Sequence, residues 1–177
     1  MTRLEMTEIF SVMLLAWPNA EMFKGGIEKL APTIELWTAC LSDVDFWTGQ
    51  QALKKLCREC KFPPTMADFK ERADSTTKEI AELIDMRWRF LRLDADTGKS
   101  PAEIFAALEQ DDPARLAIIA TGGPDAFFRK SDDPVAVWNR YDLFKSAYEQ
   151  AIRKGAALPA SQRKAVPQGN RNRRLLE

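Results

Sequence analysis

Two consecutive prolines, Pro63 and Pro64, stand just ahead of Thr65 and Asp68 in the first half of the chain. A proline has no amide hydrogen and restricts the residue before it, so a helix that reaches this segment must end there. The Thr65 hydroxyl can accept a hydrogen bond from a free backbone N–H of the next helix, and the Asp68 carboxylate faces the positive end of that helix. The segment therefore predicts a fixed turn between two helices.

Apolar residues recur at three- and four-residue spacing along most of the chain, which predicts an all-α fold with no convincing strand. Short polar side chains precede the helical runs, and the expected N-terminal caps are Thr2, Ser42 or Asp43, Thr65, Ser100, Asp112 and Asp133. Pro32 is expected to be the first residue of the second helix, because a proline fits the first turn of a helix but not its interior.

Two long helices are expected after the double proline. The first runs from Thr65 to about Leu93, with a break at residues 75–77 as an open alternative. The last runs from about Pro134 to Lys154 and brings five residues to one face, namely Trp138, Tyr141, Phe144, Tyr148 and Ile152. Between them, Gly122-Gly123 is expected to end a short helix that Asp112 caps.

The chain after Gly155 is dominated by Gly, Pro, Gln, Asn and Arg, so burial cannot offset the entropy cost of ordering it. Residues 153–177 hold seven basic residues and one acidic residue, whereas the preceding residues hold 19 basic and 25 acidic. This asymmetry indicates a charged partner or an interaction arm. The predicted organisation is a small helical domain at 1–74, a second helical module at 75–154 and a disordered basic tail at 155–177.

No apolar run approaches the roughly 18 residues that cross a bilayer, and Glu5 and Glu8 interrupt the stretch that a signal peptide would need. The odd count of three cysteines fits a reducing compartment. We therefore expect a cytoplasmic protein without a membrane contact.

Residues that carry chemistry are scarce. The chain has no histidine, the commonest general base and metal ligand. Cys57 and Cys60 share an expected helical stripe with Leu53 and Leu56, which favours buried apolar roles over a metal or redox site. Gly98-Lys99-Ser100 lacks the earlier glycine of a phosphate-binding loop. We predict that the protein is not an enzyme and holds no cofactor or metal.

The order and spacing of several segments in the first 73 residues resemble a known family. The segments are Trp37 with Leu41, Asp43 with Asp45, Ala52-Leu53-Lys54-Lys55 and Lys61-Phe62-Pro63-Pro64-Thr65-Met66-Ala67-Asp68. Over about residues 5–73 the chain resembles the N-terminal domain of the bacteriophage replicative helicase loader and inhibitor family. The resemblance implies a small helical domain followed by a largely disordered region that binds the hexameric helicase, and a location in the host bacterial cytoplasm. The helical pattern of residues 80–154 departs from that arrangement.

The same aromatic residues have a structural interpretation. Trp37, Trp47 and Phe62 at helical spacing are typical of a hydrophobic core, and a Pro-Pro-Thr segment is a general way to turn a helix corner. The functional hypothesis therefore depends on the joint pattern of Trp37, Phe62, Pro63, Pro64 and Thr65.

The basic tail has two candidate uses besides a purely solvated one. Its arginines and lysines could neutralise nucleic-acid phosphates, or its end could order on an acidic groove of a protein with two leucines as anchors. The candidate residues are Arg163, Lys164, Arg171, Arg173, Arg174, Leu175 and Leu176.

The sequence leads to one function and a runner-up. The first is a phage DNA-replication accessory protein that binds the replicative helicase, holds it inactive and delivers it to an origin-bound replisome organiser. The runner-up is a nucleic-acid-binding replication or transcription accessory protein that acts through its basic tail. A structural or assembly protein of a phage particle is a third alternative.

Overall fold

The computed structural model describes residues 1–155, except for the side chains of Ile27 and Glu28. The chain divides into two compact units, which we call unit 1 (Met1–Glu82) and unit 2 (from Leu83 onward). Within residues 1–155 every regular element is a helix, which confirms the predicted all-α fold. Helix α4 (Met66–Asp96) runs through the boundary between the units. The predicted division into a domain at 1–74 and a module at 75–154 stays a prediction.

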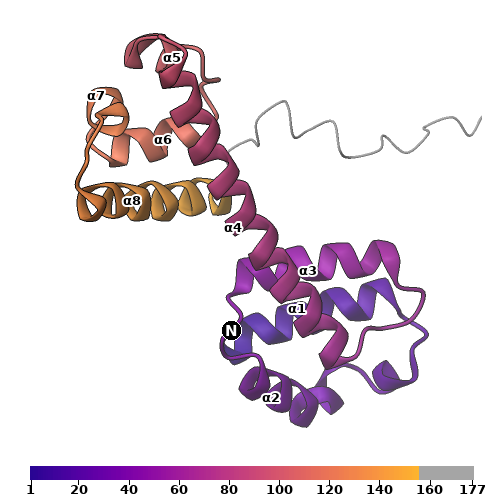
Figure 1. Ribbon diagram of the computed structural model, residues 1–177. Coiled ribbons are helices and arrows are strands. Elements are labelled where there is room, and N and C mark those ends of the chain that lie inside the picture. Colours follow the sequence, from indigo (N-terminus) through magenta and orange to yellow (C-terminus); the bar gives the residue numbers. More distant parts are fainter. Residues whose placement is uncertain (156–177) are drawn as a thin grey trace, which may run out of the picture. The chain divides into compact units, whose positions relative to one another are not determined.

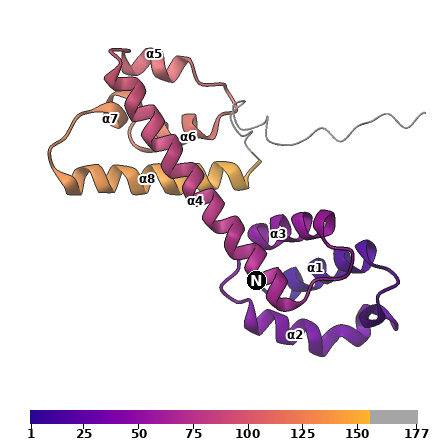
Figure 2. The ribbon, with the colours of Figure 1, turned by 45° about the vertical axis from the view of Figure 1, so that its right-hand side comes forward.

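Unit 1 is built from three helices and the first part of α4. They are α1 (Arg3–Ala16), α2 (Ala31–Cys40) and α3 (Phe46–Glu59), with the short 3₁₀ helices η1 (Glu21–Phe23) and η2 (Ile27–Leu30) between α1 and α2. Helix α1 lies between α2 and α3 in both ribbon views (Figures 1 and 2). The short loops before α3 and α4 contain the residues that cap these two helices, Asp45 and Thr65.

The residues that cap the helices of unit 1 are the predicted ones, except at α3. Thr2 caps α1 as predicted, with Glu5 completing the reciprocal capping box. The cap of α3 is Asp45, whose Oδ1 accepts from the Thr48 backbone N–H at 3.1 Å, so the prediction of Ser42 or Asp43 was wrong. The reason is Val44, which is 5% exposed and must enter the core before the helix can begin.

Helix α4 continues through residues 75–77, so the break considered there does not occur. The hydroxyl groups of Thr76 and Thr77 donate to the carbonyls of Arg72 and Ala73, at 2.9 and 3.2 Å. Threonine side chains bonded to the preceding turn are compatible with a continuous helix. Ser75, Thr76 and Thr77 thus lie within one continuous helix.

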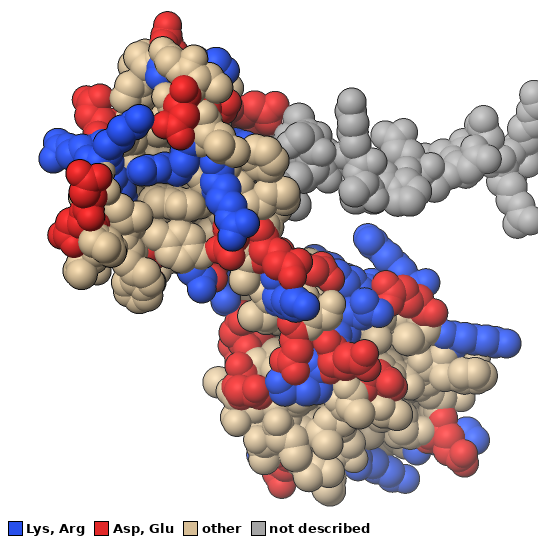
Figure 3. Space-filling model, in the orientation of Figure 1, with Lys and Arg blue, Asp and Glu red and all other residues tan. Residues whose placement is uncertain are grey.

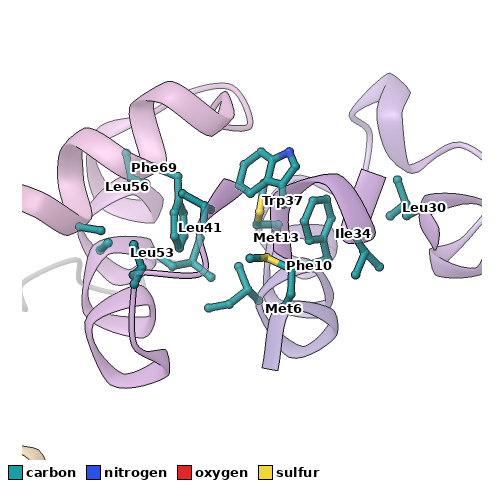
Figure 4. Packing of buried hydrophobic residues seen from close by; sticks show 14 of the residues in the cluster. Met6, Phe10, Met13, Leu30, Ile34, Trp37, Leu41, Leu53, Leu56 and Phe69 are labelled. Carbon is teal, nitrogen blue, oxygen red and sulfur yellow. The ribbon is translucent and has the colours of Figure 1, made fainter. Parts of the chain in front are cut away.

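The core of unit 1 centres on Trp37, which is 5% exposed. Its ring meets the Phe10 ring edge to face at 5.0 Å between centroids, and it lies 5.7 Å from the Phe69 ring (Figure 4). Helices α1, α2 and α4 each contribute one of these rings. Trp47 is only half-buried, and Phe62 is 71% exposed, so the expectation that Phe62 is a core residue was wrong. Phe62 stands in the segment that the prolines hold outside both helices.

Unit 2 contains the second part of α4 and four further helices. They are α5 (Pro101–Ala106), α6 (Pro113–Ala120), α7 (Pro124–Phe128) and α8 (Pro134–Arg153). Ser100, Asp112 and Asp133 cap α5, α6 and α8 as predicted. Gly122 and Gly123, with φ of 98° and 91°, end α6 in a backbone conformation that favours glycine. Helix α7, which starts directly afterwards at Pro124, was not predicted.

Aromatic rings from α4, α7 and α8 form the core of unit 2. The Trp88 ring meets those of Phe127, Tyr141 and Phe144 at centroid distances of 5.0, 5.4 and 5.3 Å. Helix α6 packs along α8 (Figure 2). Trp138 is 65% exposed, so its predicted place on the packed face of α8 was wrong. Trp138 and the buried Phe144 are six positions apart, so their side chains point roughly a third of a turn away from each other around the helix.

Candidate partner-binding surface

The segment 61–68, which we call the junction, is held by one reciprocal cap. The Asp68 Oδ2 atom accepts from the backbone N–H of Thr65 at 2.8 Å and from its hydroxyl at 2.7 Å, and the Thr65 Oγ1 atom accepts from the Asp68 N–H at 3.2 Å. The hydrogen bond from the Thr65 hydroxyl, and then that from its backbone, lowers the pKa of Asp68. Pro64 is buried, whereas the Phe62 ring points outward with the Lys61 ammonium 5.8 Å from its centroid. The junction is therefore rigid and presents one exposed aromatic ring.

A groove of about 430 Å³ lies between α1 and α3 of unit 1, and we call it the α1–α3 groove. Its α1 side is formed by Glu8, Ile9 and Val12. Its α3 side is formed by Phe46, Gln50, Leu53, Lys54, Cys57 and Arg58. The side chain of Val12 is 47% exposed, so the apolar surface of the groove is open to solvent. An open, largely apolar groove between two helices is the kind of surface that accepts a helical segment of another protein.

The charges around the α1–α3 groove are mainly positive. Lys54 and Arg58 line it from α3, Glu8 lines it from α1, and none of the three makes an ion pair with another described residue. The neighbouring Lys55 differs, because its ammonium binds Glu79 at 2.7 Å and the Thr76 hydroxyl at 3.2 Å. The hydrogen bond from Lys55 lowers the pKa of Glu79. Lys54 and Arg58 thus remain available to an acidic partner, whereas Lys55 stabilises the packing of α3 on α4.

The cysteines lie partly outside the core. Cys57 is exposed and lines the α1–α3 groove, so the prediction that it is buried was wrong. Cys60 is half-buried and packs against the core, as a small apolar residue would. The core face of α3 is occupied by Ala52, Leu53 and Leu56, which leaves Cys57 at the edge of the stripe. Partial burial, and then the neighbouring Cys60 thiol, raises the pKa of Cys57.

The groove was not predicted from the sequence. Its signal is a second set of apolar residues on α1, outside the stripe that enters the core: Leu4, Val12 and Leu15 are 79%, 47% and 80% exposed. Only Val12 lines the groove. An apolar residue outside the core face of a helix can mark a contact surface, but it cannot reveal which neighbouring helix completes it.

The predicted residues of the tail lie outside the part of the chain that the structure describes. They are Arg163, Lys164, Arg171, Arg173, Arg174, Leu175 and Leu176. Their roles therefore stay predictions. Across residues 1–155, no group of three or more His, Cys, Asp or Glu side chains could hold a metal ion, and no helix has the length and apolar character to cross a membrane.

Residues 1–70 match the family model of the N-terminal domain of the phage helicase loader and inhibitor family. The match confirms the resemblance predicted for about residues 5–73. The matched segment contains α1, α2, α3, the junction and the start of α4. No curated protein and no solved structure matches the chain.

Proposed function

Because residues 1–70 match the N-terminal domain of the phage helicase loader and inhibitor family, we propose that this protein binds a replicative helicase, holds it inactive and delivers it to an origin-bound replisome organiser. The observation that carries the proposal is the family match over residues 1–70, which contain α1, α2, α3 and the start of α4. The protein acts through the surfaces that it presents and performs no chemistry of its own. Its partners are the hexameric helicase and the organiser.

The mechanism follows from mass action. A protein that binds one conformation of the helicase more tightly than the others increases the population of that conformation. If the bound conformation cannot move along DNA, unwinding stops for as long as the complex lasts. Contact with the organiser then releases the helicase at the origin by weakening the complex. The helical body contacts one partner, and the basic tail contacts the other.

The α1–α3 groove is the surface of unit 1 that fits this role best. Its apolar floor, formed in part by Val12 and Leu53, suits the apolar face of a helix of the partner. Lys54 and Arg58 on its α3 side suit acidic residues beside that face, because complementary charges speed association and favour the correct partner. We therefore propose that the groove accepts an acidic, amphipathic helix of the helicase.

The experiment mixes the purified full chain with the replicative helicase at low salt and follows the complex by size-exclusion chromatography with light scattering. We expect one stable complex and a reduced rate of DNA unwinding. Addition of the organiser bound to origin DNA is expected to restore unwinding. Absence of a complex at about 50 mM salt, where charge contacts are screened least, contradicts the proposal.

Variants of the groove separate this surface from the rest of unit 1. Val12→Asp puts a charge on the apolar floor and is expected to weaken helicase binding about tenfold or more, since it buries an unpaired charge. Leu4→Asp is the matched control, because Leu4 lies on the same helix, is 79% exposed and is not part of the groove. Equal affinities of the two variants would exclude the groove while leaving the helicase as partner.

A charge exchange tests the basic side of the groove. The pair Lys54→Glu and Arg58→Glu is expected to weaken binding, mainly through slower association. The control pair Lys24→Glu and Lys78→Glu produces the same change of net charge at other exposed positions of unit 1. Both pairs leave Lys55 in place, so the contact between α3 and α4 is unchanged.

The charge asymmetry of the sequence favours a second candidate function, binding of nucleic acid through the tail. Deletion of residues 155–177 distinguishes the two functions. The second function is correct if three results are obtained together: the full chain binds DNA, the deletion abolishes that binding, and neither form associates with the helicase. If the shortened chain still binds the helicase, the body of the protein carries the main contact.

A further inference from the structure

Two arginines of unit 2, Arg92 and Arg140, converge beside the end of α7, and a third, Arg129, is close enough for its charge to act on Arg140. Arg92 comes from α4, Arg129 follows α7 directly, and Arg140 comes from α8. The Nη1 atoms of Arg92 and Arg140 each donate to the same acceptor, the carbonyl oxygen of Phe127, at 3.2 Å. The Arg140 Nη1 atom also donates to the carbonyl oxygen of Arg129 at 2.5 Å. Two guanidinium groups that share one oxygen lie close together, and we call the three residues the arginine cluster.

The arginine cluster is not neutralised within the described part of the chain. None of its three guanidinium groups forms an ion pair there, whereas the adjacent Lys130 pairs with Asp96 at 3.3 Å. Basic side chains lie on the α7 side of unit 2, with acidic side chains beside them (Figure 3). Burial, and then the positive charges of Arg92 and Arg129, lowers the pKa of Arg140. Like charges are therefore held close together without an ion pair to any described carboxylate.

The two carbonyl oxygens account for only part of this arrangement. Each guanidinium carries five N–H donors, and the carbonyls of Phe127 and Arg129 occupy very few of them. Cations near the end of a helix are favourable, but α7 has only five residues and Arg129 makes no side-chain hydrogen bond to it. Helix capping thus explains Arg92 and Arg140 in part and leaves the charge of Arg129 unexplained.

The framework behind the cluster is rigid. The Arg92 guanidinium carbon lies 5.7 Å from the centroid of the Trp88 ring, and that ring packs edge to face on Phe127 and Tyr141. Phe127 is fully buried, so the carbonyl that orients both arginines belongs to a fixed residue. A site whose donors are fixed before the ligand arrives loses less entropy on binding.

We propose that Arg92, Arg129 and Arg140 form a binding site for a phosphate group. Guanidinium groups match phosphate oxygens with paired N–H donors, and a phosphate offers more acceptor oxygens and more negative charge than a carboxylate. The group can belong to free phosphate or to the backbone of a nucleic acid, and the two sources share this chemistry. The site lies in unit 2 and does not depend on binding of the helicase by unit 1.

The first arm of the experiment uses inorganic phosphate and the full chain labelled with ¹⁵N at arginine. Titration at constant ionic strength is expected to shift the Nε–Hε signals of Arg92 and Arg140 in a saturable way. Arg129→Gln is expected to abolish or greatly weaken the shifts, whereas Arg3→Gln, which removes the same charge from an exposed position of unit 1 outside the α1–α3 groove, leaves them unchanged. Arg129→Lys keeps the charge but loses the paired donors, so it should bind phosphate more weakly than the native chain.

The second arm uses a fluorescent single-stranded 20-nucleotide DNA and measures anisotropy over a range of salt concentrations. Compared with Arg3→Gln, Arg129→Gln is expected to lower the affinity about threefold to tenfold and the salt slope by about 1. Since both variants retain the basic tail, any contribution of the tail cancels in the comparison. Circular dichroism of Arg129→Gln checks that the helices remain.

The results of the phosphate titration and the DNA titration together identify the source of the phosphate group. Phosphate shifts without a DNA difference identify a site for free phosphate, and a DNA difference without phosphate shifts identifies a site for a nucleic-acid backbone. Both results support the proposal. No phosphate shift up to about 50 mM, together with equal DNA binding by Arg129→Gln and Arg3→Gln, overturns it.

Discussion

The Arg87 guanidinium donates from Nη2 to Oδ2 of Asp112, whose side chain is only 4% exposed. The other oxygen of this carboxylate, Oδ1, accepts from the Ala114 backbone N–H at 2.8 Å. One buried side chain therefore caps α6 and neutralises a cation of α4. Burial, and then the negative charge of Asp112, raises the pKa of the nearby Tyr148 hydroxyl. The Arg87–Asp112 pair therefore ties α4 to α6, and the buried Tyr148 hydroxyl of α8 has no hydrogen-bond partner among the described residues.

Asp112→Ala is expected to destabilise the protein by about 3 kcal/mol or more, because it leaves a largely buried guanidinium without its partner. Asp133→Ala is the matched control. Asp133 also precedes a proline and caps a helix, with Oδ1 accepting from the Val135 N–H at 2.9 Å, but it is exposed and makes no ion pair with another described residue. Its loss should cost about 1 kcal/mol, the usual value of a cap. Urea unfolding followed by circular dichroism measures both, and equal losses would show that the ion pair adds nothing.

The two aspartates also show how far the sequence determines the fold. Both caps could be predicted, because an acid before a proline acts within one turn of its own helix. The pairing of Asp112 with Arg87 could not, since it joins residues 25 positions apart whose proximity depends on the packing of unit 2. For the same reason, the sequence could not predict the arginine cluster or the α1–α3 groove, because each combines residues from separate helices.

The incorrect predictions have a related cause. The spacing of Trp138 is compatible with a buried stripe, but only the position of the neighbouring helices decides which part of a wide stripe is covered. Phe62 is exposed for another reason, since it lies between α3 and α4 and belongs to neither helix. The prediction that Cys57 is buried was wrong for a similar reason. Fewer residues of α3 enter the core than its apolar spacing indicates, and Cys57 is not among them. The family resemblance, by contrast, depended on an ordered set of segments and was confirmed over residues 1–70.

Trp37→Ala and Phe62→Ala should differ strongly in stability. Trp37 fills the centre of unit 1 between Phe10 and Phe69, so its truncation is expected to cost about 3 to 5 kcal/mol. Phe62 is 71% exposed, and its truncation should change the free energy of unfolding by less than about 0.5 kcal/mol. Thermal unfolding compares the two variants. A large loss for Phe62→Ala would mean that this ring packs against the rest of unit 1 in solution.

The cap of α4 should contribute to stability in a pH-dependent way. Hydrogen bonds from Thr65 hold the pKa of Asp68 below its ordinary value of 3.8. Because the unfolded chain then binds this proton more readily, the stabilising contribution is complete above the unfolded pKa and is lost as the pH falls through the lower folded value. We expect the Tm of the native chain to fall more steeply below about pH 4 than that of Asp68→Asn, which has no carboxylate to protonate there.

Thermal melts from about pH 6 to pH 2 provide this comparison, and the other carboxylates cancel because both chains contain them. Glu103 offers an independent repeat in unit 2. The backbone and hydroxyl hydrogen bonds from Ser100 lower the pKa of Glu103. The Tm of Glu103→Gln should therefore fall less steeply with decreasing pH than the Tm of the native chain. Parallel Tm curves for the native chain and both variants would mean that these caps contribute no pH dependence.

Cys57 provides a chemical probe of the α1–α3 groove. Since its pKa is raised above the ordinary value of 9.0, its alkylation by iodoacetamide should have a midpoint above pH 9 in a chain that carries Cys40→Ser and Cys60→Ser. If the groove accepts the helicase, complex formation should slow the alkylation of Cys57 about tenfold or more by covering the thiol. Cys40, which is exposed on α2 and is not part of the groove, is the internal reference in the native chain. Equal protection of Cys40 and Cys57, measured by mass spectrometry of the alkylated peptides, would point to a contact outside the groove, and no protection of either would argue against any contact at this face of unit 1.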